Sequence, residues 1–217
     1  SSVSGADATE SGNQSETITI TADGDAAPTV TLATSATSIA ENAGSSLTLT
    51  ATSSIVADED ITVTISTSGT GTEGTDYSTI SDITISAGAT TGTASFTPTD
   101  DSVYEGNETG IVAIDGVSGA DAAEDGTQSV TITITENESS PTITLTTSAT
   151  SIAENAGTSL TLTATSSIVA DEDITVTIST TGTGTEGTDY STISDITISA
   201  GATTGTSSFT PTDDSVY

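Results

Sequence analysis

The chain lacks every side chain that carries a positive charge. It has no Lys, Arg or His against 31 Asp and Glu residues, so its formal net charge is −31 over 217 residues. Nucleic acids and anionic membrane surfaces are bound through patches of Lys and Arg, and both are therefore excluded as electrostatic partners. Any dense group of carboxylates in this chain must be neutralised by protons, by salt or by a bound metal ion.

The absence of Cys, His, Lys and Trp removes most of the usual catalytic chemistry. Without Cys there is no disulfide, thiol nucleophile or thiolate metal site, and without His or Lys a nucleophilic triad cannot be built. A glycosidase needs two carboxylates beside a sugar-binding cleft, but the chain has only four Tyr, two Phe and no Trp to line one. We predict that the protein is not an enzyme.

Long hydrophobic runs are also missing. None approaches the roughly 20 apolar residues of a membrane-spanning helix, so no membrane insertion is expected in this segment. The apolar residues, 32% of the chain, instead alternate with Thr, as in Leu47, Leu49 and Ala51. Ser and Thr account for 86 residues, which suits the outer faces of strands. This alternation predicts a folded all-β protein, not the disordered chain that acidic composition alone would suggest.

Internal repeats define the organisation of the chain. Residues 28–104 align with residues 141–217 at an offset of 113, and only five of the 77 aligned positions differ. Residues 3–7 and 17–21 likewise resemble residues 117–121 and 131–135. We therefore predict that residues 1–27 are the C-terminal tail of a preceding repeat and that residues 28–140 are a complete domain. Residues 141–217 would be the N-terminal part of the next repeat, without its last two strands.

Seven strands are expected in the complete repeat, separated by turns rich in Gly, Ser, Asn and Asp. They lie at about residues 29–34, 46–53, 60–67, 82–86, 93–98, 107–114 and 127–135. Seven short alternating strands predict an immunoglobulin-like, seven-stranded antiparallel sandwich. Because successive strands run in opposite directions, the first, third and fifth loops and the exit of the last strand should share one pole.

This pole collects carboxylates from distant parts of the sequence. They are Glu41, Glu73, Asp76, Asp100, Asp101, Glu105, Glu108, Glu136 and Glu138. Calcium takes six to eight oxygen ligands, commonly carboxylates with backbone carbonyls and water, so we predict Ca²⁺ as the cofactor. The alternative is a solvated acidic surface of the kind that halophilic proteins use for solubility.

The opposite pole is acidic as well, with Asp58, Glu59 and Asp60 in one loop. In a head-to-tail string this pole would meet the carboxylates of the preceding domain. The equivalent residues Asp171, Glu172 and Asp173 would then face the site of the first domain. Cations at such a junction would stiffen it, and without them the acids would repel one another.

Several motifs together resemble the Calx-beta domain family, which is common as tandem units in large bacterial surface proteins. They are Ser-Ile-Ala-Glu-Asn-Ala-Gly at 38–44, Gly-Thr-Glu-Gly-Thr-Asp-Tyr at 71–77, Ile-Thr-Ile-Ser-Ala-Gly-Ala at 83–89, Asp-Asp at 100–101 and Glu-Gly-Asn-Glu-Thr at 105–109. The resemblance implies calcium ligation by Glu41, Asp76, Asp100, Asp101, Glu105, Glu108, Glu136 and Glu138, and by Glu154, Asp189, Asp213 and Asp214 in the second copy. One departure is Gly110-Ile111, where the family usually has an aromatic residue.

Three functions are compatible with these features. The first is a calcium-rigidified structural repeat that forms the stalk of a large extracellular adhesin or the shaft of a surface filament. Neighbouring repeats of the same protein would be its partners, and it would lie at the cell surface. The second is a calcium-sensing regulatory module whose interdomain orientation changes when ions bind. The third, a lectin-like domain, has no dedicated aromatic residue or loop insertion to support it.

Two interpretations of the chain ends stay open. Residues 17–21 of one subunit could complete the partial repeat of the next by strand addition, giving self-assembled filaments. Alternatively, the sequence is a segment cut from a continuous polymer of repeats.

Overall fold

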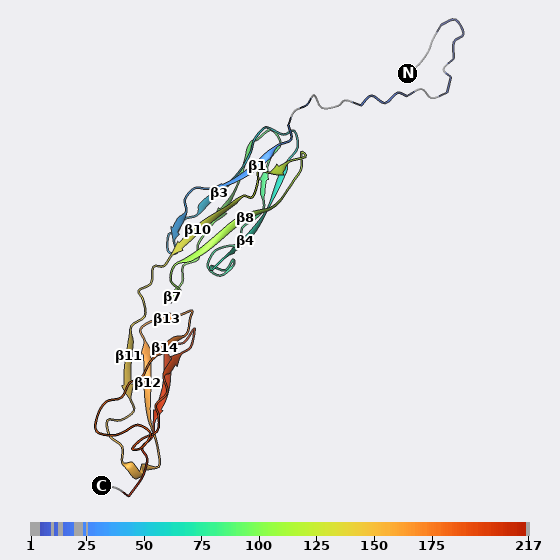
Figure 1. Ribbon diagram of the computed structural model, residues 1–217. Helices are drawn as coiled ribbons and strands as arrows, with labels where there is room; N and C mark the ends of the chain where they lie inside the picture. Colours follow the sequence, from blue (N-terminus) through green and yellow to red (C-terminus); the bar gives the residue numbers. More distant parts are fainter. Residues whose placement is uncertain (1–4, 10, 13–14, 20–23, 25, 216–217) are drawn as a thin grey trace.

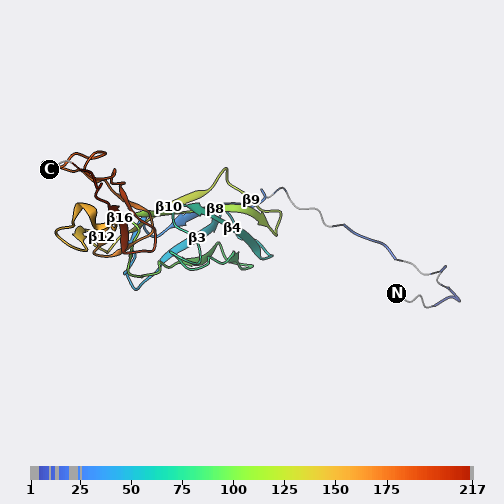
Figure 2. The ribbon, with the colours of Figure 1, turned by 90° about the horizontal axis from the view of Figure 1, so that it is seen from below.

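The structure, a computed structural model, consists of two β-rich units arranged end to end (Figure 1). It describes residues 5–9, 11–12, 15–19, 24 and 26–215. The first unit begins at Thr29 and the second at Ile143. Viewed along a perpendicular direction, the described N-terminal residues extend away from the first unit (Figure 2).

The first sheet of the first unit has the strand order β6-β3-β1-β9. Its strands are β1 (Thr29–Thr34), β3 (Leu47–Ser53), β6 (Thr91–Phe96) and β9 (Ala123–Glu124). Leu49, Ala51 and Ser53 of β3 are buried, whereas the Thr residues between them are exposed or half-buried. The alternation of apolar residues with Thr therefore selects one face of this sheet for the core.

The second sheet has the order β2-β10-β8-β4-β5. Its strands are β2 (Ser38–Ala40), β4 (Ile61–Gly69), β5 (Ile83–Ile85), β8 (Glu108–Ser118) and β10 (Ser129–Thr135). β8 lies at the centre, antiparallel to both β10 and β4. The short strand β2 runs parallel to β10 at the edge of the sheet. The sandwich of these two sheets confirms the predicted all-β, immunoglobulin-like fold.

All seven predicted strands are present, and their directions alternate along the chain as expected. Three further strands were not predicted: β2, β9 and β7 (Val103–Tyr104). Each has two or three residues, which is too short for an alternating pattern to show. β8 also continues to Ser118, beyond the predicted end at 114, because its pairing with β4 extends to that residue.

The core of the first unit is centred on a stacked aromatic pair. The rings of Tyr77 and Phe96 have centroids 4.6 Å apart and an interplanar angle of 24°, and both residues are fully buried. Gly110 of β8 leaves room for them, because a Cβ atom there would lie 2.7 Å from a Phe96 ring carbon. The glycine thus accommodates aromatic side chains that come from other elements.

The second unit contains two small sheets. One has the order β11-β12-β16, and β14 pairs with β15 in the other. The strands are β11 (Ile143–Thr147), β12 (Leu160–Ser166), β14 (Ile174–Val176), β15 (Ile196–Ile198) and β16 (Thr204–Phe209). A short 3₁₀ helix, η1 (Glu154–Ala156), follows residues 151–153, which are equivalent to β2 of the first unit but form no strand. The buried core cluster of this unit comprises Ala164, Ile196 and Ile198.

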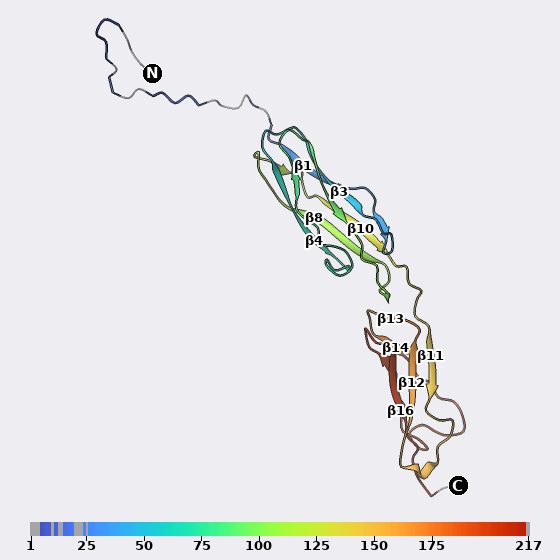
Figure 3. The same cartoon turned by 180° about the vertical axis from the view of Figure 1, so that it is seen from behind.

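A short parallel pairing joins the two units, at the ends that face each other in Figure 3. β13 (Val169–Ala170) of the second unit lies beside β7 of the first, with Val169 opposite Val103 and Ala170 opposite Tyr104. The backbone N–H of Asp171 donates to the carbonyl of Tyr104 at 3.3 Å. The junction is therefore a continuation of β-structure between the units.

The strand-like stretch predicted at residues 17–21 is only partly described. Residues 17–19 form no strand, and Ile20 and Thr21, which complete the stretch, lie outside the described residues.

Within the described part of the chain, no helix is long and apolar enough to cross a membrane.

Candidate metal centre

Six carboxylates converge at the pole of the first unit that faces the second. They form two groups of three, and within each group the ligand atoms lie within 4.8 Å of one another. We call Glu41, Glu136 and Glu138 the exit cluster, and Asp76, Glu105 and Glu108 the loop cluster. The convergence predicted from alternating strand directions is thus present.

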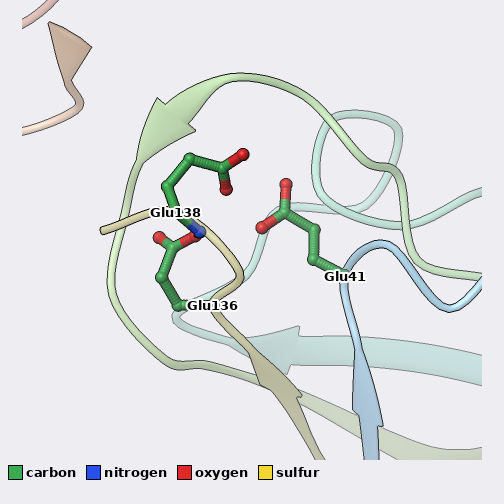
Figure 4. A group of neighbouring side chains, drawn as sticks. All are labelled: Glu41, Glu136 and Glu138. Atoms are coloured by element: carbon green, nitrogen blue, oxygen red, sulfur yellow. The ribbon is translucent and has the colours of Figure 1, made fainter. Parts of the chain in front are cut away.

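The exit cluster combines a residue after β2 with two residues after β10, and their carboxylates point toward a common space (Figure 4). Glu41 is held beside β10 because its N–H donates to the carbonyl of Thr135 at 3.0 Å. Its side chain is 5% exposed, and one carboxylate oxygen accepts from the N–H of Asp101 at 3.1 Å. Burial raises the pKa of Glu41, although the hydrogen bond from Asp101 opposes this.

Glu136 is the most strongly held carboxylate of the pole. Its Oε2 accepts from the N–H groups of Glu105 at 2.6 Å and Gly106 at 2.8 Å. Its Oε1 accepts from the N–H groups of Asn137 and Glu138, both at 2.9 Å. Burial opposes ionisation, but the backbone donors outweigh it and lower the pKa of Glu136 to about 2. This carboxylate is therefore charged at neutral pH.

Glu138 has the opposite tendency. A hydrogen bond with the Glu136 side chain, followed by burial, raises the pKa of Glu138 to about 7. Its Oε1 accepts from the side-chain amide of Asn137 at 2.9 Å. Its Oε2 is buried and has no hydrogen-bond partner among the residues that the structure describes. A buried, unpartnered carboxylate oxygen beside an ionised Glu is suited to bind a cation.

The loop cluster draws its residues from two loops and the start of β8. Asp76 is fixed by the N–H of Thr72, which donates to its Oδ2 at 2.6 Å. Burial, followed by the charge of Asp76, raises the pKa of both Glu105 and Glu108 to about 7. The charge of Asp171, from the second unit, also raises the pKa of Glu108. Glu105 and Glu108 are thus only partly ionised at neutral pH unless a cation binds among these carboxylates.

The second unit contributes acids to this pole as predicted. Asp171, Glu172 and Asp173 line one pocket with Tyr104 and Glu105, with a volume of about 280 Å³. The junction therefore brings carboxylates of one unit to the carboxylate site of the other.

Asp100 and Asp101 border the exit cluster but belong to neither group of three. Their charges contribute to the raised pKa of Glu41. Asp101 is also used locally, because its Oδ1 accepts from the N–H of Val103 at 2.7 Å. Glu73 is likewise engaged, since its carboxylate accepts from Thr67 Oγ1 and from the N–H of Ile80, both at 2.7 Å.

The predicted ligands of the second unit are more dispersed. Asp189 repeats the geometry of Asp76, accepting from the N–H of Thr185 at 2.6 Å. Glu154 accepts from the N–H of Asp214 at 3.4 Å, a longer contact than that between Glu41 and Asp101. Among the described residues, Glu154, Asp189, Asp213 and Asp214 do not form a group of three close carboxylates.

Sequence reasoning did not anticipate the backbone groups that hold Glu136. The N–H groups of Glu105 and Gly106 point at it because the chain turns at Gly106, whose φ is 76°. Asn107 completes the turn, with its Oδ1 accepting from the N–H of Glu136 at 3.0 Å. The Glu-Gly-Asn tripeptide was the available signal, since Gly supports positive φ in tight turns.

The pole offers an all-oxygen donor set, and the chain has no side-chain cation to pair with it. Hard divalent cations such as Ca²⁺ prefer oxygen ligands of this kind. The unpartnered Oε2 of Glu138 and the raised pKa values of Glu105 and Glu108 both fit a site that is completed by such an ion.

Comparisons with solved structures return Calx domains. The apo-form Calx CBD1 domain is 16% identical, with a TM-score of 0.43, and the alignment covers 51% of this chain and 99% of that one. CBD12 from CALX1.2 is 17% identical and the calcium binding domain CBD12 of CALX1.1 is 16% identical. For both, the TM-score is 0.41 and the alignment covers 82% of this chain and 73% of that chain. Among curated proteins, none matches the sequence.

The sequence profile of the Calx-beta domain matches residues 23–138 and again residues 136–217. These two tandem matches span both units of the structure, including the residues of both carboxylate clusters. The chain therefore belongs to the Calx-beta domain family.

Proposed function

We propose that this chain is a calcium-binding structural segment whose tandem units act as a stiff spacer. The observation that carries the proposal is the pair of carboxylate clusters at the pole between the units, with oxygen atoms within 4.8 Å and no side-chain cation in the whole chain. Several uncompensated carboxylates at such distances destabilise a fold, whereas a bound Ca²⁺ turns the same groups into ligands.

The ligands of the proposed site come from the six clustered carboxylates. Glu41, Glu136 and Glu138 would hold one ion, and Asp76, Glu105 and Glu108 a second. Backbone donors already orient Glu136 and Asp76, so these groups need little rearrangement to bind. Ca²⁺ would supply the positive charge that the chain lacks.

The structural role is supported by the repetition of nearly identical units and by their end-to-end arrangement (Figure 1). A spacer requires length and stiffness more than individual binding faces, and the stability of an array sums over its units and interfaces. We place such a segment at the cell surface, in the stalk of an adhesin or the shaft of a filament. Its partners there are neighbouring repeats of the same protein.

A second candidate function is calcium sensing. It is favoured by the position of the loop cluster beside the junction, where Asp171 of the second unit affects the pKa of Glu108 in the first. An ion bound there would couple calcium concentration to the orientation of the two units.

Calorimetric unfolding with EDTA and with millimolar Ca²⁺ tests calcium binding. An ion that binds only the folded state raises the Tm, and Glu41→Gln should remove much of that rise. Asp58→Asn, which removes a carboxylate at the opposite pole, is the matched control and should leave it intact. An identical Tm in EDTA and Ca²⁺ at moderate salt would refute the proposal.

The dissociation constant separates the two functions. Extracellular calcium modules bind with Kd of about 10⁻⁴–10⁻³ M, whereas sensors bind at about 10⁻⁷–10⁻⁵ M. Isothermal titration giving a value in the first range supports the spacer. A value in the second, with a calcium-dependent change in interunit distance, supports the sensor.

A further inference from the structure

The same eight-residue sequence occupies two different environments in this chain. Residues 53–60 and residues 166–173 both read Ser-Ser-Ile-Val-Ala-Asp-Glu-Asp. In the second unit this segment contains β13, which pairs with β7 of the first unit. In the first unit the corresponding residues 55–57 form no strand.

The difference in pairing exposes apolar side chains on the first unit. Val56 is 59% exposed and Ile55 is 40% exposed, whereas Val169 and Ile168 are half-buried in the second unit. Ile55 and Val56 are adjacent to each other at the pole farthest from the carboxylate clusters. Exposed apolar side chains of this kind are typical of protein interfaces. Within the described part of the chain, no segment pairs with this pair of residues.

The unpaired segment already has the local conformation of the paired one. Ser53 Oγ donates to the carbonyl of Ile55 at 2.8 Å, and Ser166 Oγ to that of Ile168 at 2.6 Å. The carbonyl of Ala57 accepts from Gly88 N–H at 2.8 Å, which matches the bond from Gly201 N–H to Ala170.

The end of the segment is anchored in the same way. The Oδ1 of Asp60 accepts from Ala87 N–H at 2.7 Å, and that of Asp173 accepts from Ala200 N–H at 2.8 Å. The segment of the first unit is thus pre-organised without a partner, and docking onto it needs little ordering of the backbone.

We propose that the edge formed by Ile55, Val56 and Ala57 is the docking surface for a preceding unit of the same chain, which pairs through its own Val-Tyr edge. Val56 would lie opposite the Val of that edge and Ala57 opposite the Tyr, in the parallel register that Val169 and Ala170 adopt against Val103 and Tyr104. The partner is a second Calx-beta unit, because the same sequence at residues 166–173 binds the β7 edge of such a unit at the junction within this chain.

The N-terminal sequence is consistent with that occupant. Residues 3–7 and 17–21 repeat the end of the first unit. The turn at Gly5, Ala6 and Asp7 also has φ values of 98°, 50° and 53°, nearly those of the turn at Gly119, Ala120 and Asp121, at 93°, 52° and 53°. Residues 3–7 and 17–21 therefore have the sequence of the end of a unit, and residues 5–7 have its local turn conformation.

Docking here would place a second acidic loop beside a carboxylate site. Asp58 holds the position that Asp171 holds in the second unit, where its charge reaches Glu108. The same junction would then recur at each boundary between units. The proposed contact consists of backbone pairing and apolar side chains, so it goes beyond calcium binding and does not depend on it.

The test uses disulfide trapping, for which the Cys-free chain is well suited. The test protein carries one additional unit in front of Pro28. This unit is made by placing a second copy of residues 28–116 directly before residue 3, so that residues 3–27 form its C-terminal end. Val56→Cys is combined with Val103→Cys of the added unit. The reference is the pair Val103→Cys and Val169→Cys in the 217-residue chain, which occupies the same register at the observed junction.

We expect both pairs to form intramolecular disulfides at similar rates under mild oxidation, as measured by peptide mass mapping. The background rate of disulfide formation is measured with Ala43→Cys in place of Val56→Cys, combined with Val103→Cys of the added unit. Ala43 is exposed but lies at the opposite pole. A Val56 pair that forms no faster than this background, while the reference pair forms, overturns the proposal. Predominantly intermolecular disulfides at Val56 overturn it as well, since the partner would then be another molecule.

Discussion

The two units of this chain share 72 of 77 aligned residues, yet they differ greatly in how much of that sequence is buried. Leu32 is 7% exposed in the first unit, whereas its equivalent Leu145 is 53% exposed in the second. Phe96 is fully buried, and its equivalent Phe209 is only half-buried. The first unit contains β8 and β10 between these residues and the solvent, and the described second unit has no counterpart of either strand.

The comparison separates locally determined structure from structure that requires distant strands. β1, β3 and β6 pair in the same register as β11, β12 and β16, and the stacked Tyr–Phe pair recurs with a centroid distance of 4.8 Å. By contrast, β4 covers nine residues beside β8, while its equivalent β14 covers three. β2 pairs with β10 in the first unit, whereas the equivalent residues 151–153 of the second unit form no strand. Long-range pairing thus determines the length of β4 and the existence of β2.

The largest expected effect comes from truncating the equivalent aromatic residues. Phe96→Ala should destabilise the first unit by about 3–5 kcal/mol, the usual cost of removing a buried Phe. Phe209→Ala should cost clearly less, because Phe209 is already partly solvated. Urea unfolding followed by circular dichroism measures both. Equal losses would show that the second unit is as well packed in solution as the first.

A calcium experiment sharpens the comparison at the site. Asp76→Asn should reduce the calcium-induced stabilisation, which is about 2.7 kcal/mol at a free ion concentration of 100 times Kd. Asp189→Asn changes the equivalent residue of the second unit and should have little effect, because no group of three close carboxylates is described there. Calorimetry with and without Ca²⁺ measures the difference. A matching loss in both variants would place an ion in each unit.

A smaller effect is expected from filling the space beside the aromatic pair. Gly110→Ala should destabilise the first unit by about 1–3 kcal/mol, as overpacking of a core usually does, because the new methyl would meet the Phe96 ring. Gly116→Ala is the control in the same strand, where a Cβ has nothing within 4 Å. Thermal unfolding of both variants is the measurement. A neutral Gly110→Ala would contradict the packing described here.

The smallest expected effect is a pH dependence of the calcium-free first unit. Glu105 and Glu108 have pKa values raised from 4.5 to about 7, so the folded state binds protons more tightly than the unfolded state. Their contribution to stability is fully present below about pH 4.5 and is lost as the pH rises through 7. In EDTA, the Tm should fall modestly across this range, and Glu105→Gln with Glu108→Gln should flatten the profile. Saturating Ca²⁺ should also remove the fall, and an unchanged slope with calcium would argue against the loop cluster as its site.

Much of the fold was predictable because its strands carry their own signal. The alternation of Leu49 and Ala51 with Thr identifies β3 without any knowledge of its neighbours, and the direction of each strand follows from the preceding turn. The opposite directions of successive strands also predicted the pole at which Glu41, Asp76 and Glu136 meet. The strands β2 and β7 were not predictable, because each exists only through pairing with a segment distant in the sequence.

The sequence predicted which acidic residues meet at the site, but not which of them have a lowered pKa and which have a raised one. Glu136 and Glu138 are separated by one residue, yet the pKa of one is lowered and that of the other is raised. The cause is a set of backbone N–H groups that donate to Glu136: first that of Glu138, and then those of Glu105 and Gly106 at the turn. Such directional contacts depend on three-dimensional placement, so a list of acids in sequence order does not reveal them.

The pairing of β13 with β7 has a geometric consequence for longer arrays of such units. A junction made by a defined strand register fixes both the translation and the rotation that carry one unit onto the next. When the same operation is applied repeatedly without closing on itself, it generates a helix of units with a constant pitch. Regularly spaced surface features, such as the exposed Thr faces of the strands, would then wind around the array at a period set by this two-residue contact.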